Sequence, residues 1–351
     1  MQSVEIDLGR VPILSTIKRL YNIVSAPVER NSVLPECFDD SFSSVFDVLE
    51  KYVPWFNRPI TKSMRSIPID YLHNDRDVIV CVSGGKDSVA TAIKLKEQGY
   101  NVYLYHLHGI NKTYYNEYQA VEDVAKVLDL PCFIDECVLK GEHKFVEHPL
   151  KNYIIASGAI CFALHINVAP NIAFGNFTNS PIEELPFNVC GGDSIDMWAA
   201  YEKIVQTVIP DFHIMLPLET QADTMNIISN HLEVLPYCMS CISPYRFRTY
   251  WKERTEKNYG IRLMENRCGC CWKCAVEYIT FADKDYLEYN EAYYIHCLEV
   301  LGRTMQKEED VYAIHMEDLW ETYISTPIEK SKLGDKIHYG IVQNGKAKFE
   351  K

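Results

Sequence analysis

Residues 78–88 read Val-Ile-Val-Cys-Val-Ser-Gly-Gly-Lys-Asp-Ser, and this stretch decides the fold. The apolar, β-rich residues 78–82 predict a short buried strand, and residues 89–98 predict a helix that ends at Gly99. A turn between a strand and a helix N-terminus directs backbone N–H groups and partial positive charge at one point. Glycines at 84 and 85 leave room there for an anion. The stretch therefore predicts a seat for pyrophosphate, and hence for ATP, although a glycine turn without a ligand is the plainer alternative.

The loop differs from the Walker type, which places four residues between its first glycine and Gly-Lys-Ser/Thr. Residues 83–88 instead resemble the pyrophosphate loop (PP-loop) of the ATP pyrophosphatases. The resemblance implies that ATP is cleaved to AMP and pyrophosphate while a substrate oxygen is adenylated. It also implies the residues that hold the β- and γ-phosphates: Ser83, Gly84, Gly85, Lys86 and Ser88.

Lys86 and Asp87 are the candidate catalytic residues. We expect Lys86 to neutralise phosphate charge. Asp87 is expected to coordinate Mg²⁺, because carboxylate oxygens suit that ion, with local capping of the helix as an equal alternative.

Strand and helix patterns alternate from residue 76 to about residue 216. We expect strands at 78–82, 102–107, 132–134, 172–174 and 213–216, with helices at 89–98, 118–128, 153–168 and 196–208. Such alternation predicts an α/β fold with a doubly wound parallel sheet covered on both faces, in the manner of adenine nucleotide alpha hydrolases.

Ligands of such sheets bind at the carboxyl ends of the strands. We therefore expect adenine beside Tyr105, His106 and Leu107, held largely by backbone groups. Gly175 and Asn176, after the fourth strand, are expected beside nucleotide and substrate. Asp193 is a weaker candidate, with a turn residue as its alternative. His106 and His108 are expected to be core or rim histidines rather than a metal pair, and Cys190 is a structural cysteine or a sulfur carrier.

The cysteines predict a metal site near the C-terminus. Cys268, Cys271 and Cys274 form two overlapping CxxC steps, which leave Cys270 aside, and Cys238 and Cys241 form another CxxC. Four thiolates on such turns suit a structural zinc ion, with an iron–sulfur cluster or a catalytic disulfide as alternatives. The fourth ligand is either Cys241 or Cys238, and we prefer Cys241. An aromatic and basic group close by, residues 245–251, could stack a base or pack around the metal.

Three regions follow from these patterns. Residues 1–75 are expected to form a helical N-terminal extension, and residues 76–235 the PP-loop ATP-binding α/β domain. Residues 236–351 are expected to hold the zinc-binding segment and a helical C-terminal region.

The order of loop, sheet and cysteine cluster resembles the 7-cyano-7-deazaguanine synthase family. Residues 151–168, 172–176 and 215–218 match its patterns, and the resemblance covers roughly residues 76–280. It implies adenylation of a 7-carboxy-7-deazaguanine-like carboxylate, with ammonia as co-substrate and an amide or nitrile as product. Two departures leave the substrate open. Residues 219–222 lack the family's Thr-Lys, and no Asp-x-Arg pattern surrounds residues 190–193.

Two other functions stay open. Some PP-loop enzymes transfer sulfur to tRNA, which would need a reactive cysteine such as Cys132, Cys137 or Cys190. A nucleotide-binding partner protein without catalysis is the other alternative.

Composition limits the partners. The formal net charge of −13, from 35 basic and 48 acidic residues, disfavours direct binding of nucleic acid and favours a small-molecule substrate. No apolar run is long enough to span a membrane and residues 1–10 lack a signal-peptide core, so a cytoplasmic protein is expected. A homodimer, or a protein partner bound through the terminal extensions, is compatible with the sequence.

Overall fold

The structure is a computed structural model of the 351-residue chain. It describes residues 47–48, 74–109, 117–136, 151–178, 195–206, 209–239, 241, 243, 245–281, 288–305, 338–339 and 349–350. Most of the expected N-terminal extension, residues 1–75, therefore lies outside the described residues, as do Cys137, Cys190 and Asp193. Among the helices that are described, none has both the length and the apolar character needed to cross a bilayer.

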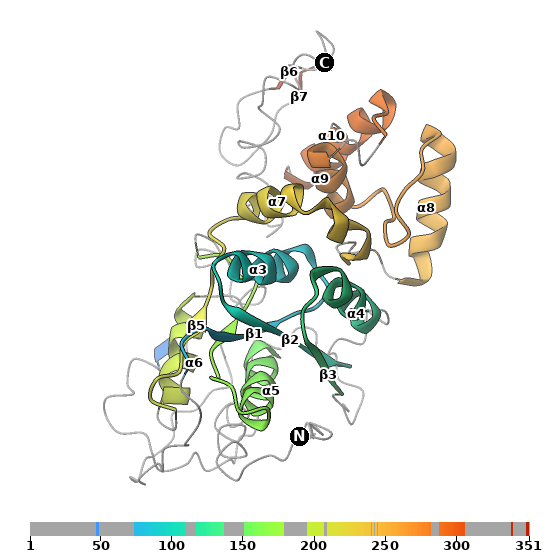
Figure 1. Cartoon of the computed structure of the whole chain (residues 1–351). Coiled ribbons are helices and arrows are strands. Elements are labelled where there is room, and N and C mark those ends of the chain that lie inside the picture. Colours follow the sequence, from blue (N-terminus) through green and yellow to red (C-terminus); the bar gives the residue numbers. More distant parts are fainter. Residues whose placement is uncertain are drawn as a thin grey trace, which may run out of the picture.

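A five-stranded parallel sheet forms the centre of the molecule (Figure 1). Its spatial order is β3-β2-β1-β4-β5, with registers such as Val80 opposite Leu104 and Ala173 opposite Met215. The strands are β1 (Asp77–Cys81), β2 (Asn101–His108), β3 (Cys132–Glu136), β4 (Ile172–Ala173) and β5 (Ile214–Met215). The order reverses between β1 and β4, which is where ligands bind in sheets of this kind.

Helices cover both faces of the sheet, which confirms the doubly wound α/β fold. α3 (Lys86–Glu97) and α4 (Glu117–Leu128) lie on one face, and α5 (Lys151–His165) and α6 (Ile195–Gln206) on the other (Figure 1). β1 is buried along its whole length because both faces are covered. α7 (Gln221–Asn230) packs beside α3.

Helices also dominate the region after the sheet. A 3₁₀ helix, η5 (Leu232–Tyr237), leads to α8 (Tyr245–Tyr259), α9 (Trp272–Phe281) and α10 (Glu291–Met305), and a small hairpin is formed by β6 (His338–Tyr339) and β7 (Phe349–Glu350). The sequence patterns predict no helix over residues 245–259. α8 lacks a strong apolar stripe, since only a few of its residues, such as Arg248 and Thr255, are buried. Buried side chains of α9 and α10 join one hydrophobic cluster with those of α3 and α4.

Gly158 on α5 fits against the aromatic ring of Tyr105 on β2. That ring is fully buried and stacks against Phe133 and Phe162, with ring centroids 6.2 and 5.9 Å away. A Cβ at position 158 would collide with the Tyr105 hydroxyl and lie 3.0 Å from the ring carbon that bears it.

We expect Gly158→Ala to lower the free energy of unfolding by about 1–3 kcal/mol, because the added methyl overfills a closed contact. Urea unfolding followed by circular dichroism measures the change. Tyr105→Phe in the same background removes the colliding oxygen and should recover part of the loss. Equal instability of the single and double variants would contradict this packing.

Candidate functional site

The loop between β1 and α3 is organised by its own polar groups. The Ser88 hydroxyl donates to the Gly85 carbonyl at 3.0 Å and accepts from the Ser83 backbone N–H at 3.3 Å. Gly85 is the N-cap of α3, and its carbonyl also accepts from the Val89 N–H. Ser83 is exposed, so the loop reaches the surface at the carboxyl edge of the sheet.

Two glycines let other backbone segments approach this loop closely. Gly84 has a φ of +75°, and a Cβ there would lie 2.9 Å from the Cβ of Ala120. A Cβ at Gly175 would lie 2.6 Å from the Ser88 nitrogen and 2.7 Å from the Asp87 carbonyl carbon. Only a glycine therefore fits where the turn after β4 meets the first turn of α3. The structure thus brings Gly175 together with the loop, as the sequence predicts, and Asn176 follows it half-buried.

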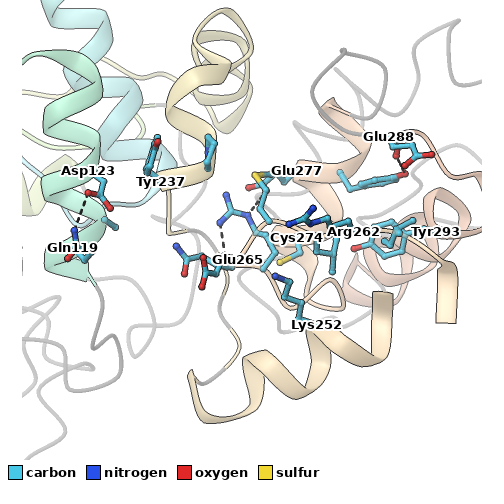
Figure 2. Close-up of a pocket in the computed structure, with 18 residues that line it drawn as sticks. Gln119, Asp123, Tyr237, Lys252, Arg262, Glu265, Cys274, Glu277, Glu288 and Tyr293 are labelled. Carbon is cyan, nitrogen blue, oxygen red and sulfur yellow. Dashed lines mark hydrogen bonds and ion pairs between the residues drawn. The ribbon is translucent and has the colours of Figure 1, made fainter. Parts of the chain in front are cut away.

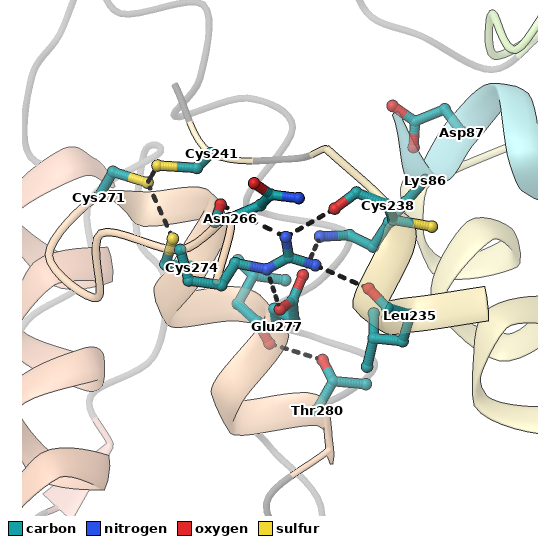
Figure 3. A network of polar contacts seen from close by, with 12 residues as sticks. Lys86, Asp87, Leu235, Cys238, Cys241, Asn266, Cys271, Cys274, Glu277 and Thr280 are labelled. Carbon is teal, nitrogen blue, oxygen red and sulfur yellow. Dashed lines mark hydrogen bonds and ion pairs between the residues drawn. The ribbon is translucent and has the colours of Figure 1, made fainter. Parts of the chain in front are cut away.

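Lys86 points away from solvent into an ion pair that the sequence did not reveal. Its ammonium lies 2.9 Å from a carboxylate oxygen of Glu277 on α9, and the other oxygen of that carboxylate accepts from Arg267 (Figure 3). Lys86, Arg267 and Glu277 are 6%, 2% and 2% exposed. Burial alone would raise the pKa of Glu277, but Arg267 and Lys86 hold it below its ordinary value. The expected contact of Lys86 with phosphate stays a prediction.

Further hydrogen bonds join this triad to the segment that precedes the cysteine cluster. Arg267 donates to the carbonyls of Cys238, at 2.6 Å, and Leu235, at 3.0 Å. The Met239 N–H donates to the Gly84 carbonyl at 2.6 Å. The segment after η5 and helix α9 are therefore bound directly to the loop, through the Met239–Gly84 hydrogen bond and the Lys86–Glu277 ion pair.

Asp87 accepts a hydrogen bond at 3.0 Å from the Gln221 side chain at the start of α7. Gln221 lies in the stretch where the sequence departs from the 7-cyano-7-deazaguanine synthase pattern. An amide at this position satisfies one carboxylate oxygen without adding charge. The role of Asp87 towards Mg²⁺ stays a prediction.

The side chains at the end of β2 are buried. Tyr105, His106 and Leu107 are at most 3% exposed, so their side chains belong to the core. His106 Nδ1 lies 2.8 Å from the Val82 carbonyl, and burial lowers the pKa of His106 to about 4. The imidazole is therefore a neutral core group, as expected. Contact between adenine and the backbone here stays a prediction.

The structure brings together the four cysteines that we prefer as ligands. The thiol groups of Cys241, Cys268, Cys271 and Cys274 all lie within 4.8 Å of one another. Neighbouring sulfurs are 3.4 to 3.9 Å apart. Four sulfurs around one zinc ion would be about 3.8 Å apart, given Zn–S bonds of about 2.3 Å, so the donor set fits such an ion.

The two other cysteines of this region lie outside the group of four. Cys270 lies 3.7 Å from Cys268 but outside the group. The Cys238 side chain is fully buried in the main hydrophobic cluster, and burial raises its pKa to about 12. These positions agree with the preference for Cys241. Trp251 packs against the cysteine cluster. Phe247 and Tyr250, by contrast, are 44% and 56% exposed.

A cleft of about 1010 Å³ opens between α4, η5 and α9, and its described lining contains no residue of the loop 83–88 (Figure 2). α4, η5, α8, α9 and the segment 261–267 contribute to its walls. Two of its lining residues connect with the loop, since Ala120 lies against Gly84 and Glu277 binds Lys86. The lining combines the aromatic side chain of Tyr237, the amides of Gln119 and Asn266, and the charged side chain of Lys252. The cleft is large enough for a nucleotide-sized acceptor.

Comparison with known proteins relates part of this chain to a family model and to other proteins. Residues 76–158 match the family model described as the tRNA methyl transferase HUP domain. A stretch of 125 residues is 29% identical to "7-cyano-7-deazaguanine synthase 2" of Sulfurisphaera tokodaii, which covers 35% of this chain and 27% of that relative. The chain therefore spans only about a quarter of that protein's length.

One solved structure is a predicted subunit of tRNA methyltransferase from Methanocaldococcus jannaschii. It is 17% identical over 44% of this chain and 88% of its own, with a TM-score of 0.24. The family model and the synthase match agree with the loop and sheet described above. Residues 76–158 therefore resemble a HUP domain, in a chain that resembles the PP-loop ATP pyrophosphatases and, among them, a 7-cyano-7-deazaguanine synthase.

Proposed function

We propose that this protein is an ATP-dependent ligase that adenylates the carboxylate of a 7-deazaguanine-type base and replaces the adenylate with nitrogen. AMP and pyrophosphate are the by-products, and the final product is an amide or a nitrile. The observation that carries the proposal is the glycine-lined loop between β1 and α3, at the point where the strand order of the sheet reverses.

The loop supports ATP as the donor of the adenylyl group. Gly85, at the N-cap of α3, leaves the first-turn N–H groups of the helix accessible to a polyphosphate. A PP-loop domain implies ATP binding, and the hydroxyls of Ser83 and Ser88 add further polar groups beside the same turn. In this proposal Asp87 is the residue that would hold Mg²⁺, which would reduce the repulsion between phosphate and the attacking carboxylate.

The proposed chemistry consists of two adenylation steps. A carboxylate oxygen of the substrate attacks the α-phosphorus of ATP, the bond to the β-phosphate oxygen breaks, and pyrophosphate leaves. Ammonia then displaces AMP to give an amide. A second adenylation of the amide oxygen, followed by loss of AMP and two protons, gives the nitrile. The protein contributes orientation and charge stabilisation rather than a covalent intermediate.

The cleft between α4, η5 and α9 is the proposed acceptor site. Its walls offer amide side chains such as Asn266, carboxylates such as Asp123 and the cations Lys252 and Arg262. A deazaguanine carboxylate presents both hydrogen-bond donors and a negative charge, so this mixed lining suits it. The 29% identity to a 7-cyano-7-deazaguanine synthase supports the substrate class.

Sulfur transfer to tRNA is the rival function. The description of the matching family, a tRNA methyl transferase HUP domain, supports tRNA as a substrate but names no sulfur transfer. Sulfur transfer requires a nucleophilic cysteine. Cys132 is exposed, but desolvation and the neighbouring Glu122 raise its pKa to about 11, so little thiolate is present at neutral pH. A persulfide trapped on Cys132 in the presence of ATP would favour this rival.

The reaction is tested by incubating the full chain with ATP, Mg²⁺, ammonium and 7-carboxy-7-deazaguanine. We expect pyrophosphate release and a mass corresponding to the amide or nitrile. Omission of the carboxylate is the control and should leave only slow ATP hydrolysis. ATP binding without carboxylate-dependent pyrophosphate release would contradict a ligase and favour a nucleotide-binding partner protein.

Gly85→Ala separates ATP binding from stability. Its backbone angles, φ −73° and ψ 153°, suit alanine, and the new Cβ would meet only ordinary contacts at 3.4 and 3.7 Å. We expect the free energy of unfolding to change by less than about 1 kcal/mol. The Cβ should weaken ATP binding at least about tenfold, because charged hydrogen bonds to the bare backbone are lost.

Isothermal titration with ATP and urea unfolding give the two readouts. Gly175→Ala is the matched variant, and it should lose both stability and affinity because its Cβ would overlap the loop backbone. Wild-type ATP affinity in Gly85→Ala would contradict the position of the phosphates.

We also propose that the four grouped cysteines hold one structural zinc ion. Metal analysis of the purified chain should find about one zinc per molecule. Cys271→Ser should abolish tight binding, whereas Cys270→Ser should retain it, because only the former belongs to the group of four. Equal zinc content in both variants would contradict this ligand set.

A further inference from the structure

We propose that the buried triad of Lys86, Glu277 and Arg267 couples the cysteine cluster to the nucleotide loop, so that zinc and ATP strengthen each other's binding. In this role Glu277 and Arg267 are positioning residues. The proposal rests on the ATP and zinc sites proposed above, and it gives a role to Glu277 and Arg267, which belong to neither site.

Two members of the triad are fixed by their neighbours in the cluster. Arg267 directly precedes Cys268. Glu277 follows Cys274 by three residues on α9, so the two side chains lie on the same face of that helix. A metal ion that fixes the two cysteines would therefore also fix the guanidinium and the carboxylate beside them.

The third member belongs to the loop. Lys86 is the first residue of α3, and its ammonium lies 2.9 Å from Glu277. Because the side chain is 6% exposed, release of the ammonium from Glu277 within this interior would leave a buried charge without its partner. A displacement of α9 should consequently displace the start of α3.

A second connection runs in parallel through the backbone. The segment 238–241 contributes Cys241 to the cluster, and within it the Met239 N–H donates to the Gly84 carbonyl at 2.6 Å. Arg267 holds the start of the same segment through the Cys238 carbonyl. The backbone hydrogen bond thus connects the cluster to Gly84, and the ion pair connects it to Lys86. Figure 3 shows the connection through Lys86 and Glu277.

Free volume is small on the side of the triad that faces the loop. A cavity of about 30 Å³ lies between Gly85, Lys86 and Asp87 on one side and Met239, Trp272 and neighbouring residues on the other. That is room for about one water molecule. The contact between loop and α9 is therefore packed on this side, where a displacement of one is transmitted to the other, whereas Arg267 and Glu277 also border the cleft of about 1010 Å³.

Linkage is reciprocal, and this defines the experiment. ATP affinity of the full chain is measured by titration calorimetry with zinc loaded and after chelation. Zinc affinity is measured by competition with a chromophoric chelator, with and without ATP. We expect each ligand to tighten the other by the same factor, about tenfold.

Glu277→Gln should remove this coupling and weaken ATP binding, because the loop loses its anchor. Lys86→Met is the second variant, since it cuts the link to the loop but leaves the pair Arg267–Glu277 intact and so preserves the cluster. Lys86→Met should bind zinc with wild-type stoichiometry and show no coupling. Lys126→Met, which removes an exposed ammonium on α4, is the control and should keep the full effect.

Three outcomes overturn the proposal. ATP and zinc affinities that are independent in the wild type exclude coupling while leaving both binding sites intact. Tighter ATP binding by Glu277→Gln would show that Glu277 competes with phosphate for Lys86 instead of positioning the loop. A wild-type chain that binds zinc but no ATP would refute the proposed function together with this inference.

Discussion

A carboxylate enclosed by two cations is the interaction on which the arrangement of the sheet and the C-terminal helices depends. Glu277 is 2% exposed, and a lone carboxylate at that depth would be protonated or would unfold the interface. Its ion pairs with Lys86 and Arg267 lower its pKa instead. Removal of one partner from such a buried group costs about 3–5 kcal/mol. The three segments that supply these charges are therefore held together as one unit.

This unit explains why the cysteine cluster lies beside a nucleotide loop. The expected boundary at residue 235 stays a prediction, but buried residues on both sides of it, such as Val234 and Trp272, belong to one hydrophobic cluster. The loop is confined by Ala120 on α4 and by Gly175 after β4, so the sheet fixes it from one side. Met239 and Glu277 fix it from the other. A rigid loop keeps its backbone donors oriented before the ligand arrives, which lowers the entropic cost of binding.

The sheet could be predicted because local signals suffice for it. The strands carry short apolar runs, α4 has an apolar face with helical spacing, α5 is mostly apolar, and the alternation leaves few topologies. The four grouped cysteines were also predictable, since CxxC spacing constrains their geometry locally. The triad was not. Lys86 and Glu277 are 191 residues apart, and in the sequence each looks like an ordinary surface charge. Helix α8 was not predicted for a different reason. Its exposed face carries aromatic residues such as Tyr250, so the alternation of apolar and polar faces that marks a helix is weak there.

Gln221 shows how a departure from a family pattern acquires a physical meaning. The 7-cyano-7-deazaguanine synthase pattern has a basic residue in this stretch, whereas Gln221 is neutral and donates to Asp87 at 3.0 Å. A lysine at this distance would offset the charge of Asp87, but an amide orients the carboxylate and leaves that charge in place. Hard divalent cations select oriented carboxylate oxygens. The hydrogen bond from Gln221 is therefore compatible with the proposed role of Asp87 towards Mg²⁺.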